Sequence, residues 1–221
     1  MTALPSLGYH GNRWPPKGPE THEVRIVNTA EKRLLELIRE RAYRYSPETP
    51  FQLSSGRLSP HYVDLRALLC APEALVATGT ILFDRIKRFE RETHTRVDAV
   101  GGPADGAIPI AAAVAYHSHQ VAEPIETFFV RKEPKGHGLK RWVEGHSTSG
   151  SRVVIVDDVV TTGSSTLKAI QAATQHGFEV VKVIVLVDRL EGGDEKLSNL
   201  SIPYEAIFTL GDIAAVPSRQ P

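Results

Sequence analysis

The chain has 221 residues, of which 41% are apolar, and its 26 lysines and arginines are balanced by 26 aspartates and glutamates. This composition is typical of a globular protein and excludes a disordered or fibrous chain. The chain has no apolar stretch of about 18 residues and no apolar stretch near its start that suits a signal sequence, so we expect neither a membrane span nor secretion. The balanced charge predicts no protein-wide attraction to nucleic acid, and the single cysteine, Cys70, excludes an internal disulfide, so we expect a cytoplasmic protein with Cys70 as a small buried residue.

The N-terminal quarter of the chain contains a tail, a helix and a hairpin in prediction. Residues 1–27 are rich in glycine and proline without periodicity, so we predict a tail or surface arm. Apolar residues then recur at helical spacing, which predicts an amphipathic helix capped by Asn28 and ending near Pro47. Two β-type runs, at 51–53 and 61–65, flank a segment rich in serine, glycine and proline, which predicts a β-hairpin.

The rest of the chain alternates between helical and strand patterns. A second helix is predicted from Pro72. Short apolar runs rich in β-branched residues then follow, at residues 97–101, 126–130, 152–156 and 180–187. Helical patterns lie between most of these runs, at residues 107–116 and 164–176. This alternation indicates right-handed βαβ units. We therefore predict one α/β domain over residues 28–221, with an open, mainly parallel sheet flanked by helices and the first helix and hairpin as an N-terminal addition. Ligands of such sheets bind beyond the carboxyl ends of the strands.

The segment RVVIVDDVVTTGSSTLKAI, residues 152–170, carries the strongest chemical signal. Asp157 and Asp158 follow an apolar run, and adjacent carboxylates resist burial unless hydroxyl donors or a cation accompany them. A loop of small residues then enters a helix, and its backbone N–H groups suit a phosphate. Together these features fit a ribose 5-phosphate. The alternative, in which the acids only end a strand and the loop only caps a helix, does not explain their compact order.

A basic segment, RKEPKGHGLKRWVEG at residues 131–145, follows another strand pattern. From Arg131 to Arg141, five basic residues stand against one acidic residue, a local formal charge of +4. Its proline and glycines indicate a loop rather than a helix or strand. Such a loop can stabilise a departing pyrophosphate and exclude water. A solvated charge run and a nucleic-acid contact, with Trp142 as the stacking residue, remain alternatives on these residues alone.

The sequence VVIVDDVVTTGSS closely resembles the ribose-phosphate motif of type I phosphoribosyltransferases, whose donor is 5-phosphoribosyl 1-diphosphate. The resemblance implies the fold of that family, with the acidic pair holding the ribose hydroxyls and the small-residue loop holding the 5-phosphate. The implied donor-binding residues are Asp157, Asp158, Val159, Val160, Thr161, Thr162, Gly163, Ser164 and Ser165.

Two further motifs resemble the orotate phosphoribosyltransferases within that family. RKEPKGHG is similar to their RKExKxHG catalytic loop, and FQLSSGRLSPHYVDLR is similar to their N-terminal SGR segment. The resemblance implies transfer of the phosphoribosyl group to orotate, giving orotidine 5-phosphate and pyrophosphate in pyrimidine nucleotide synthesis. It also implies a homodimer whose loop reaches the neighbouring site, and magnesium carried mainly by the diphosphate rather than by protein side chains. The implied pyrophosphate-binding catalytic residues are Arg131, Lys132, Lys135 and His137, and the implied orotate-binding residues are Ser54, Thr161 and Arg189.

Two positions depart from the pattern of many family members. Ser54 stands where they carry lysine, and Asp105 with Gly106 stands in the glycine-rich segment 100–111 where others carry lysine after an aromatic residue. Asp105 therefore places an unexpected negative charge beside a polyanionic substrate. Two alternatives follow: a phosphoribosyltransferase for another base, and a non-catalytic regulator that senses the donor and binds nucleic acid.

Overall fold

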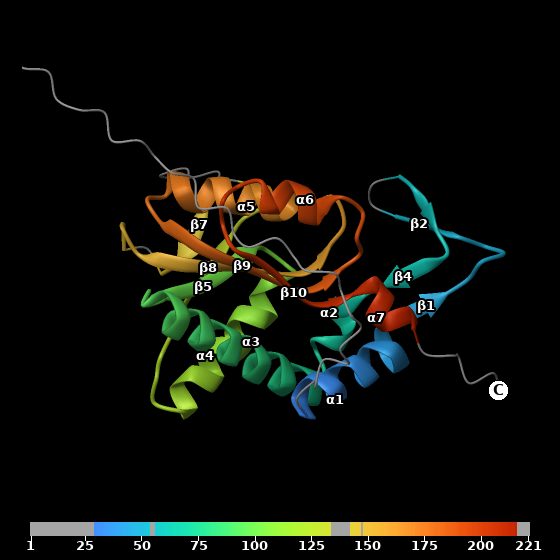
Figure 1. The fold of residues 1–221 in the computed structure, drawn as a ribbon, viewed down its shortest axis with the longest axis horizontal. Helices are drawn as coiled ribbons and strands as arrows, with labels where there is room; N and C mark the ends of the chain where they lie inside the picture. Colours follow the sequence, from blue (N-terminus) through green and yellow to red (C-terminus); the bar gives the residue numbers. More distant parts are fainter. Residues whose placement is uncertain (1–28, 54–55, 134–141, 147, 216–221) are drawn as a thin grey trace, which may run out of the picture.

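The computed structural model describes residues 29–53, 56–133, 142–146 and 148–215, and its centre is a six-stranded sheet (Figure 1). The strand order is β10-β9-β8-β5-β6-β7, and every neighbouring pair is parallel except β6 with β7. The strands are β5 (Ala99–Pro103), β6 (Glu126–Val130), β7 (Val143–Gly145), β8 (Arg152–Val160), β9 (Glu179–Asp188) and β10 (Tyr204–Thr209). The predicted open, mainly parallel sheet is confirmed, and the short antiparallel edge strand β7 is an addition to it.

Helices cover both faces of this sheet, as Figure 1 shows, with α1, α3 and α4 on one side and α5 and α6 on the other. The helices are α1 (Thr29–Leu37), α2 (Leu65–Leu68), α3 (Pro72–Thr93), α4 (Ala107–Gln120), α5 (Ser164–Gln175), α6 (Gly193–Ser198) and α7 (Leu210–Ala214). Side chains of a strand alternate between faces, so Val154 and Val156 of β8 pack into the core on the α3 side while Val153 and Ile155 pack into the core with α5. Burial on both faces explains why the sequence shows continuous apolar runs here.

The N-terminal addition consists of two small antiparallel sheets rather than one long hairpin. The helix predicted to reach Pro47 is interrupted earlier: α1 continues as a π-helical turn, η1 (Ile38–Ala42), and the chain then extends into β1 (Tyr43–Tyr45). The two predicted β-type runs do form strands, but the predicted pairing between them is wrong. Strand β2 (Phe51–Gln52) pairs with β3 (Leu58–Ser59), and β4 (His61–Val63) pairs with β1. The addition thereby carries residues 57–61 toward the sheet edge that bears the site.

Buried charges tie the addition to the sheet. Arg85 of α3 pairs with Glu31 of α1 and, at 3.5 Å, with Glu205 of β10. Glu205 also pairs with Lys182 of β9 at 2.7 Å, and Lys182 is only 9% exposed. Because loss of one partner from a buried pair leaves the other charge uncompensated, this network holds α1 and β10 in fixed relation.

Cys70, expected to be buried, is exposed in the turn between α2 and α3. In the described part of the chain, no helix is both long and apolar enough to cross a membrane. The tail predicted over residues 1–27 and the cap predicted at Asn28 lie outside the described residues.

Candidate active site

The candidate site lies where the carboxyl ends of β5, β8 and β9 meet. Each strand is followed by a loop that carries predicted site residues, at 104–106, 161–163 and 189–192. Because these strands are parallel neighbours, their following loops come together at one edge of the sheet. The acidic pair, the phosphate loop and Arg189, distant in the sequence, thus face a common region.

Asp157 is a buried carboxylate with a full set of donors on one oxygen. Its residue is 3% exposed, and its Oδ2 accepts hydrogen bonds from Thr166 Oγ1 at 2.8 Å and Ser165 Oγ at 3.3 Å. The backbone N–H of Asp158 donates to its Oδ1 at 3.0 Å. Burial, together with the neighbouring charge of Asp158, raises the pKa of the Asp157 carboxyl above its ordinary value. The pair therefore favours a ligand that donates hydroxyl hydrogens or brings positive charge.

The glycine-rich loop packs directly against this pair. A Cβ atom at Gly106 would lie 2.5 Å from Asp158 Oδ1 and 3.1 Å from Asp157 Oδ1, so a side chain there would require the Asp158 carboxylate to move. Helix α4 starts at the next residue, Ala107, and the positive end of its dipole is therefore adjacent to the carboxylates. Glycine at this position lets the loop approach the two acids closely.

The predicted phosphate loop adopts the geometry expected of an anion site. Gly163 has a left-handed backbone, with φ of +72°, and leads into α5, which begins at Ser164. The hydroxyls of Thr162 and Ser164 are hydrogen bonded to each other at 3.0 Å, and Ser164 and Ser165 are exposed. Free N–H groups of a helix's first turn, with hydroxyls beside them, are suited to binding phosphate oxygens.

Val159 and Val160 lie within the motif but contribute their side chains to the core. Val160 is 1% exposed, and its carbonyl accepts a hydrogen bond from the backbone N–H of Arg189 at 3.0 Å. Val159 is partly buried and packs against the core. Both residues therefore hold the backbone of the motif in place, and their side chains serve the core.

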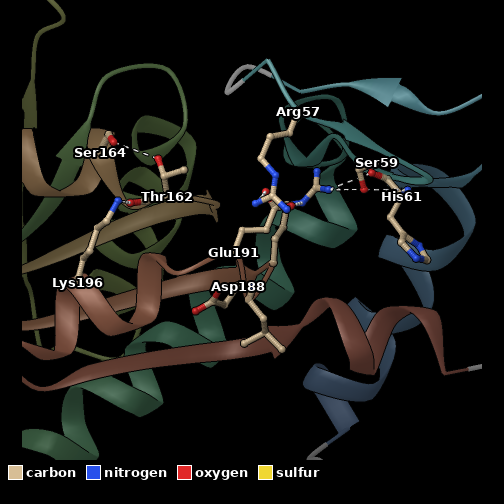
Figure 2. Close-up of polar contacts among 10 residues, drawn as sticks. Arg57, Ser59, His61, Thr162, Ser164, Asp188, Glu191 and Lys196 are labelled. Atoms are coloured by element: carbon tan, nitrogen blue, oxygen red, sulfur yellow. Dashed lines mark hydrogen bonds and ion pairs between the residues drawn. The ribbon is translucent and has the colours of Figure 1, made fainter.

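Arg189 is a buried cation held by the N-terminal addition, and Figure 2 labels its partners Ser59, His61 and Glu191. It is 5% exposed, and its Nη2 donates to Ser59 Oγ at 3.0 Å and to the His61 carbonyl at 3.1 Å. Its Nε lies 2.9 Å from Glu191 Oε1 in an ion pair, although the hydrogen-bond angle is poor. Arg57 Nη1 is 3.9 Å from the other oxygen of Glu191. Two arginines around one internal carboxylate form a fork suited to a ligand carboxylate.

Of the two other residues predicted to contact orotate, the structure describes Thr161 but not Ser54. Thr161 is half-buried at the start of the phosphate loop, next to the backbone contact between Val160 and Arg189. Ser54 lies outside the described residues. Gly56 beside it has φ of +81°, a left-handed turn that brings Arg57 toward Glu191.

The basic loop is the connection between β6 and β7. The backbone N–H of Arg131 donates to the Trp142 carbonyl at 2.8 Å, which closes the base of this hairpin, and Arg131 Nη1 lies 3.4 Å from Glu144. Lys132 forms an ion pair with Asp105 of the glycine-rich loop. The acid that looked out of place beside a polyanion is thus neutralised by a loop lysine in the ligand-free protein. Lys135 and His137 lie outside the described residues.

No group of three or more histidine, cysteine or acidic side chains able to hold a metal is present among the described residues. Asp157 has its oxygens engaged by protein donors, whereas Asp158 is half-buried. This donor set fits a magnesium ion that keeps most of its waters and arrives with a phosphate ligand, since Mg²⁺ is commonly bound by one or two carboxylates together with substrate oxygens.

Sequence reasoning missed three residues of the site. Thr166 supplies the shortest hydrogen bond to Asp157, Ser59 holds Arg189, and Glu191 pairs with it. Thr166 and Glu191 adjoin the motifs that were singled out, so their proximity in sequence was an available signal. Ser59 lies within the segment similar to the SGR motif, but its contact with Arg189 spans 130 positions of the chain, so its role could not be read from the sequence.

Comparison with known proteins gives consistent matches. Residues 76–206 match the family model described as phosphoribosyl transferase domain. The orotate phosphoribosyltransferase of Aquifex aeolicus (strain VF5) is 43% identical over 182 residues, which are 82% of this chain and 96% of that protein. A crystal structure of Mycobacterium tuberculosis H37Rv orotate phosphoribosyltransferase with Fe(III) dicitrate has a TM-score of 0.70 at 34% identity, covering 84% of this chain and 99% of that chain. Another, with 5-phospho-alpha-D-ribosyl 1-diphosphate, has a TM-score of 0.65 at 28% identity and covers 86% and 94%.

Proposed function

The chain belongs to the orotate phosphoribosyltransferases of the phosphoribosyltransferase family, and from this premise we propose how its own residues bind the two substrates and transfer the phosphoribosyl group. The enzyme class is a pentosyltransferase of pyrimidine nucleotide biosynthesis. The observation that supports the assignment of the site best is the convergence of three features at one sheet edge: an acidic pair, a phosphate loop and a buried arginine fork.

The donor, 5-phosphoribosyl 1-diphosphate, occupies the edge above β8 in our proposal. Its ribose hydroxyls donate to Asp157 and Asp158, which need donors because of their burial and mutual repulsion. Its 5-phosphate lies against the N-terminus of α5, where the loop 161–165 offers N–H groups and hydroxyls. In this proposal a single ribose 5-phosphate reaches from the acidic pair to the loop.

Orotate binds in the fork beside the N-terminal addition. Arg189 is oriented by Ser59 and by the His61 carbonyl, so its guanidinium is pre-organised for the orotate carboxylate. Arg57, 67% exposed along its side chain, is a second cation at the mouth of this fork. Thr161 and Ser54 complete the proposed orotate contacts.

The chemical step is a displacement at the anomeric carbon of the ribose. The bond from that carbon to the diphosphate oxygen breaks, the bond to an orotate ring nitrogen forms, and pyrophosphate leaves. Arg131, Lys132, Lys135 and His137 stabilise the negative charge that grows on the leaving group. Lys132 exchanges Asp105 for pyrophosphate as the loop engages. Asp158 would help to hold a magnesium ion that arrives with the diphosphate, and the ion would supply neutralisation of the diphosphate charge.

Three wider features belong to the same proposal. The chain works as a homodimer in which the loop between β6 and β7 reaches the neighbouring site, as the family resemblance implies. Residues 28–221 act as one domain. A cytoplasmic location accords with an exposed free thiol at Cys70, which a reducing compartment would preserve.

The test is a turnover assay with orotate, the donor and magnesium. We expect loss of orotate absorbance with stoichiometric formation of orotidine 5-phosphate and pyrophosphate, and none without magnesium. The non-catalytic alternative is tested in parallel by a mobility-shift assay with single- and double-stranded nucleic acid. A folded protein that shifts nucleic acid but leaves orotate unchanged would overturn the proposal in favour of the regulator.

A further inference from the structure

Helix α6 packs so closely against the phosphate loop that a side chain at Gly193 would collide with the loop backbone. It follows Arg189 through two glycines, and a Cβ atom at Gly193 would lie 2.6 Å from the Thr161 carbonyl oxygen and 3.0 Å from the Gly163 nitrogen. From the other side, the Cβ position of Gly163 faces Gly193 and the side chain of Leu197. Gly192, with φ of +85°, makes the turn that sets α6 in this place. The first turn of α6 is therefore fixed relative to the loop.

This helix brings a lysine to the loop (Figure 2). Lys196 Nζ donates to the Thr162 carbonyl at 3.4 Å, beside the hydroxyl pair of Thr162 and Ser164. Its side chain is exposed, and no carboxylate of the described residues lies within ion-pair distance of it. Its ammonium therefore has one long contact to a neutral oxygen and spare donors.

The loop itself lacks positive charge. Residues 157–165 contain two acids and no base, although the expected ligand group is a phosphate dianion. Of the acids on α6, Asp194 acts electrostatically on Tyr204, which places it toward β10, and Glu195 is exposed. Lys196 is the cation that a hydrogen bond ties to this loop in the described part of the chain.

We propose that Lys196 is a phosphate-binding residue, whose ammonium leaves the Thr162 carbonyl or shares it to contact the 5-phosphate of the ribose ligand. This inference rests on the proposed function, because it takes the loop as the 5-phosphate site. The bond is charge-assisted, and the flexible stem of lysine allows the ammonium to follow the phosphate. Since the 5-phosphate is unchanged by the reaction, the contact stabilises donor, transition state and product equally, and it acts on binding rather than on kcat.

The experiment compares Lys196→Met with Lys196→Arg, and with Lys32→Met as a control that removes the same charge from the exposed face of α1. We expect Lys196→Met to raise both the KM for the donor and the Kd for ribose 5-phosphate by about tenfold, as for loss of one partly exposed charge-assisted bond. The KM for orotate, kcat and the unfolding temperature should stay near wild type. Lys196→Arg should retain most of the affinity, and Lys32→Met all of it.

The inference is overturned if Lys196→Met binds ribose 5-phosphate as tightly as wild type, or if Lys32→Met weakens it equally, since the effect would then be absent or merely long-range. A fall in kcat with unchanged affinity would overturn it as well. Calorimetric binding of ribose 5-phosphate needs no turnover, so Lys196 is tested even if orotate proves not to be the substrate. Failure of the proposed function would instead appear as a wild-type protein that binds ribose 5-phosphate and converts no orotate.

Discussion

At the scale of single residues, the site is built from groups that are unfavourable in the ligand-free fold. Asp157 is the clearest case, because burial and the Asp158 charge raise the pKa of its carboxyl to about 7. A carboxyl whose folded pKa exceeds its unfolded pKa binds its proton more tightly in the folded chain. Its contribution to stability is thus present at low pH and is lost as pH rises from the unfolded pKa to the folded one. At neutral pH the carboxylate that we propose to bind the ribose therefore lowers the stability of the fold.

Replacement of Asp157 by asparagine should therefore stabilise the ligand-free protein above neutral pH while abolishing turnover. At pH 8 we expect the unfolding free energy to rise by about 1–2 kcal/mol, which is a few degrees in unfolding temperature for a chain of this size. At pH 5 the two proteins should unfold at similar temperatures, because the wild-type carboxyl is then protonated. Thermal unfolding between pH 5 and pH 8 measures this, with the exposed Asp84→Asn as control. A variant less stable than wild type at pH 8 would contradict the account.

The ion pair between Arg189 and Glu191 is a second case in which a charged group of the site is buried. Arg189 is buried, and the Glu191 side chain is only 13% exposed, so removal of the carboxylate leaves a poorly compensated cation. A ligand carboxylate bound at the fork would supply the missing charge. Glu191 thus compensates the charge of Arg189, and we expect it to set how strongly that arginine attracts a ligand carboxylate.

We expect Glu191→Gln to lower the unfolding free energy of the ligand-free protein by about 1–3 kcal/mol. Orotidine 5-phosphate should then raise its unfolding temperature more than it does for wild type, and uridine 5-phosphate, which lacks the carboxylate, should not. The exposed Arg33–Glu73 pair provides the control, since Glu73→Gln should cost less than about 1 kcal/mol. Equal effects of the two nucleotides on the variant would argue against a carboxylate fork.

At the scale of elements, the long strands and helices were predictable, whereas of the short strands only β2 and β4 were predicted, and without their pairing partners. Helix α3 begins at Pro72 as predicted, because proline suits the first helical position, and the buried strands β8 and β9 read directly as apolar runs. In contrast, β1, β2, β3, β4 and β7 have two or three residues each. Periodicity over so few residues is uninformative, and tertiary partners decide their pairing.

The interruption of the first helix has the same origin. Tyr45 fits the helical pattern, yet Tyr43 and Tyr45 both contact the His61 ring. The Tyr45 ring is tilted against it with the centroids 5.0 Å apart, and the Tyr43 hydroxyl is hydrogen bonded to His61 Nδ1 at 2.7 Å. Contacts with a strand eighteen positions away outweigh local preference here. The result matters for function, because the His61 carbonyl orients Arg189.

The β6–β7 hairpin carries, at the edge of the sheet, the loop that we propose to be catalytic. Its edge position means that a loop substitution should act on chemistry and leave folding intact. We expect Lys135→Ala to lower kcat by at least about 100-fold, as for loss of one group that stabilises transition-state charge, with an unfolding temperature within about 2 °C of wild type. Steady-state kinetics and thermal unfolding measure both, against Lys32→Ala. Proportionate losses of activity and stability would contradict the assignment.

At the scale of the whole molecule, zero net charge conceals a sharp segregation. Asp157 and Asp158 lie near the carboxyl end of β8, and the described bases Arg131 and Lys132 follow the carboxyl end of β6, so both groups are at the same edge of the parallel sheet. The motifs could be assigned from sequence because each lies in a contiguous segment. Their joint geometry could not, because Gly106 against Asp158, Ser59 against Arg189 and α6 against the phosphate loop depend on contacts between distant segments.

The most direct test of the central claim is the ratio of kcat/KM for orotate to that for uracil and for adenine, measured with the same donor and magnesium. A site built around Arg189 for a carboxylate should prefer orotate over uracil by at least about 10⁴, because the base without the carboxylate leaves buried polar groups unpaired. Comparable turnover of uracil or adenine, or a folded protein that converts none of the three, would contradict the account.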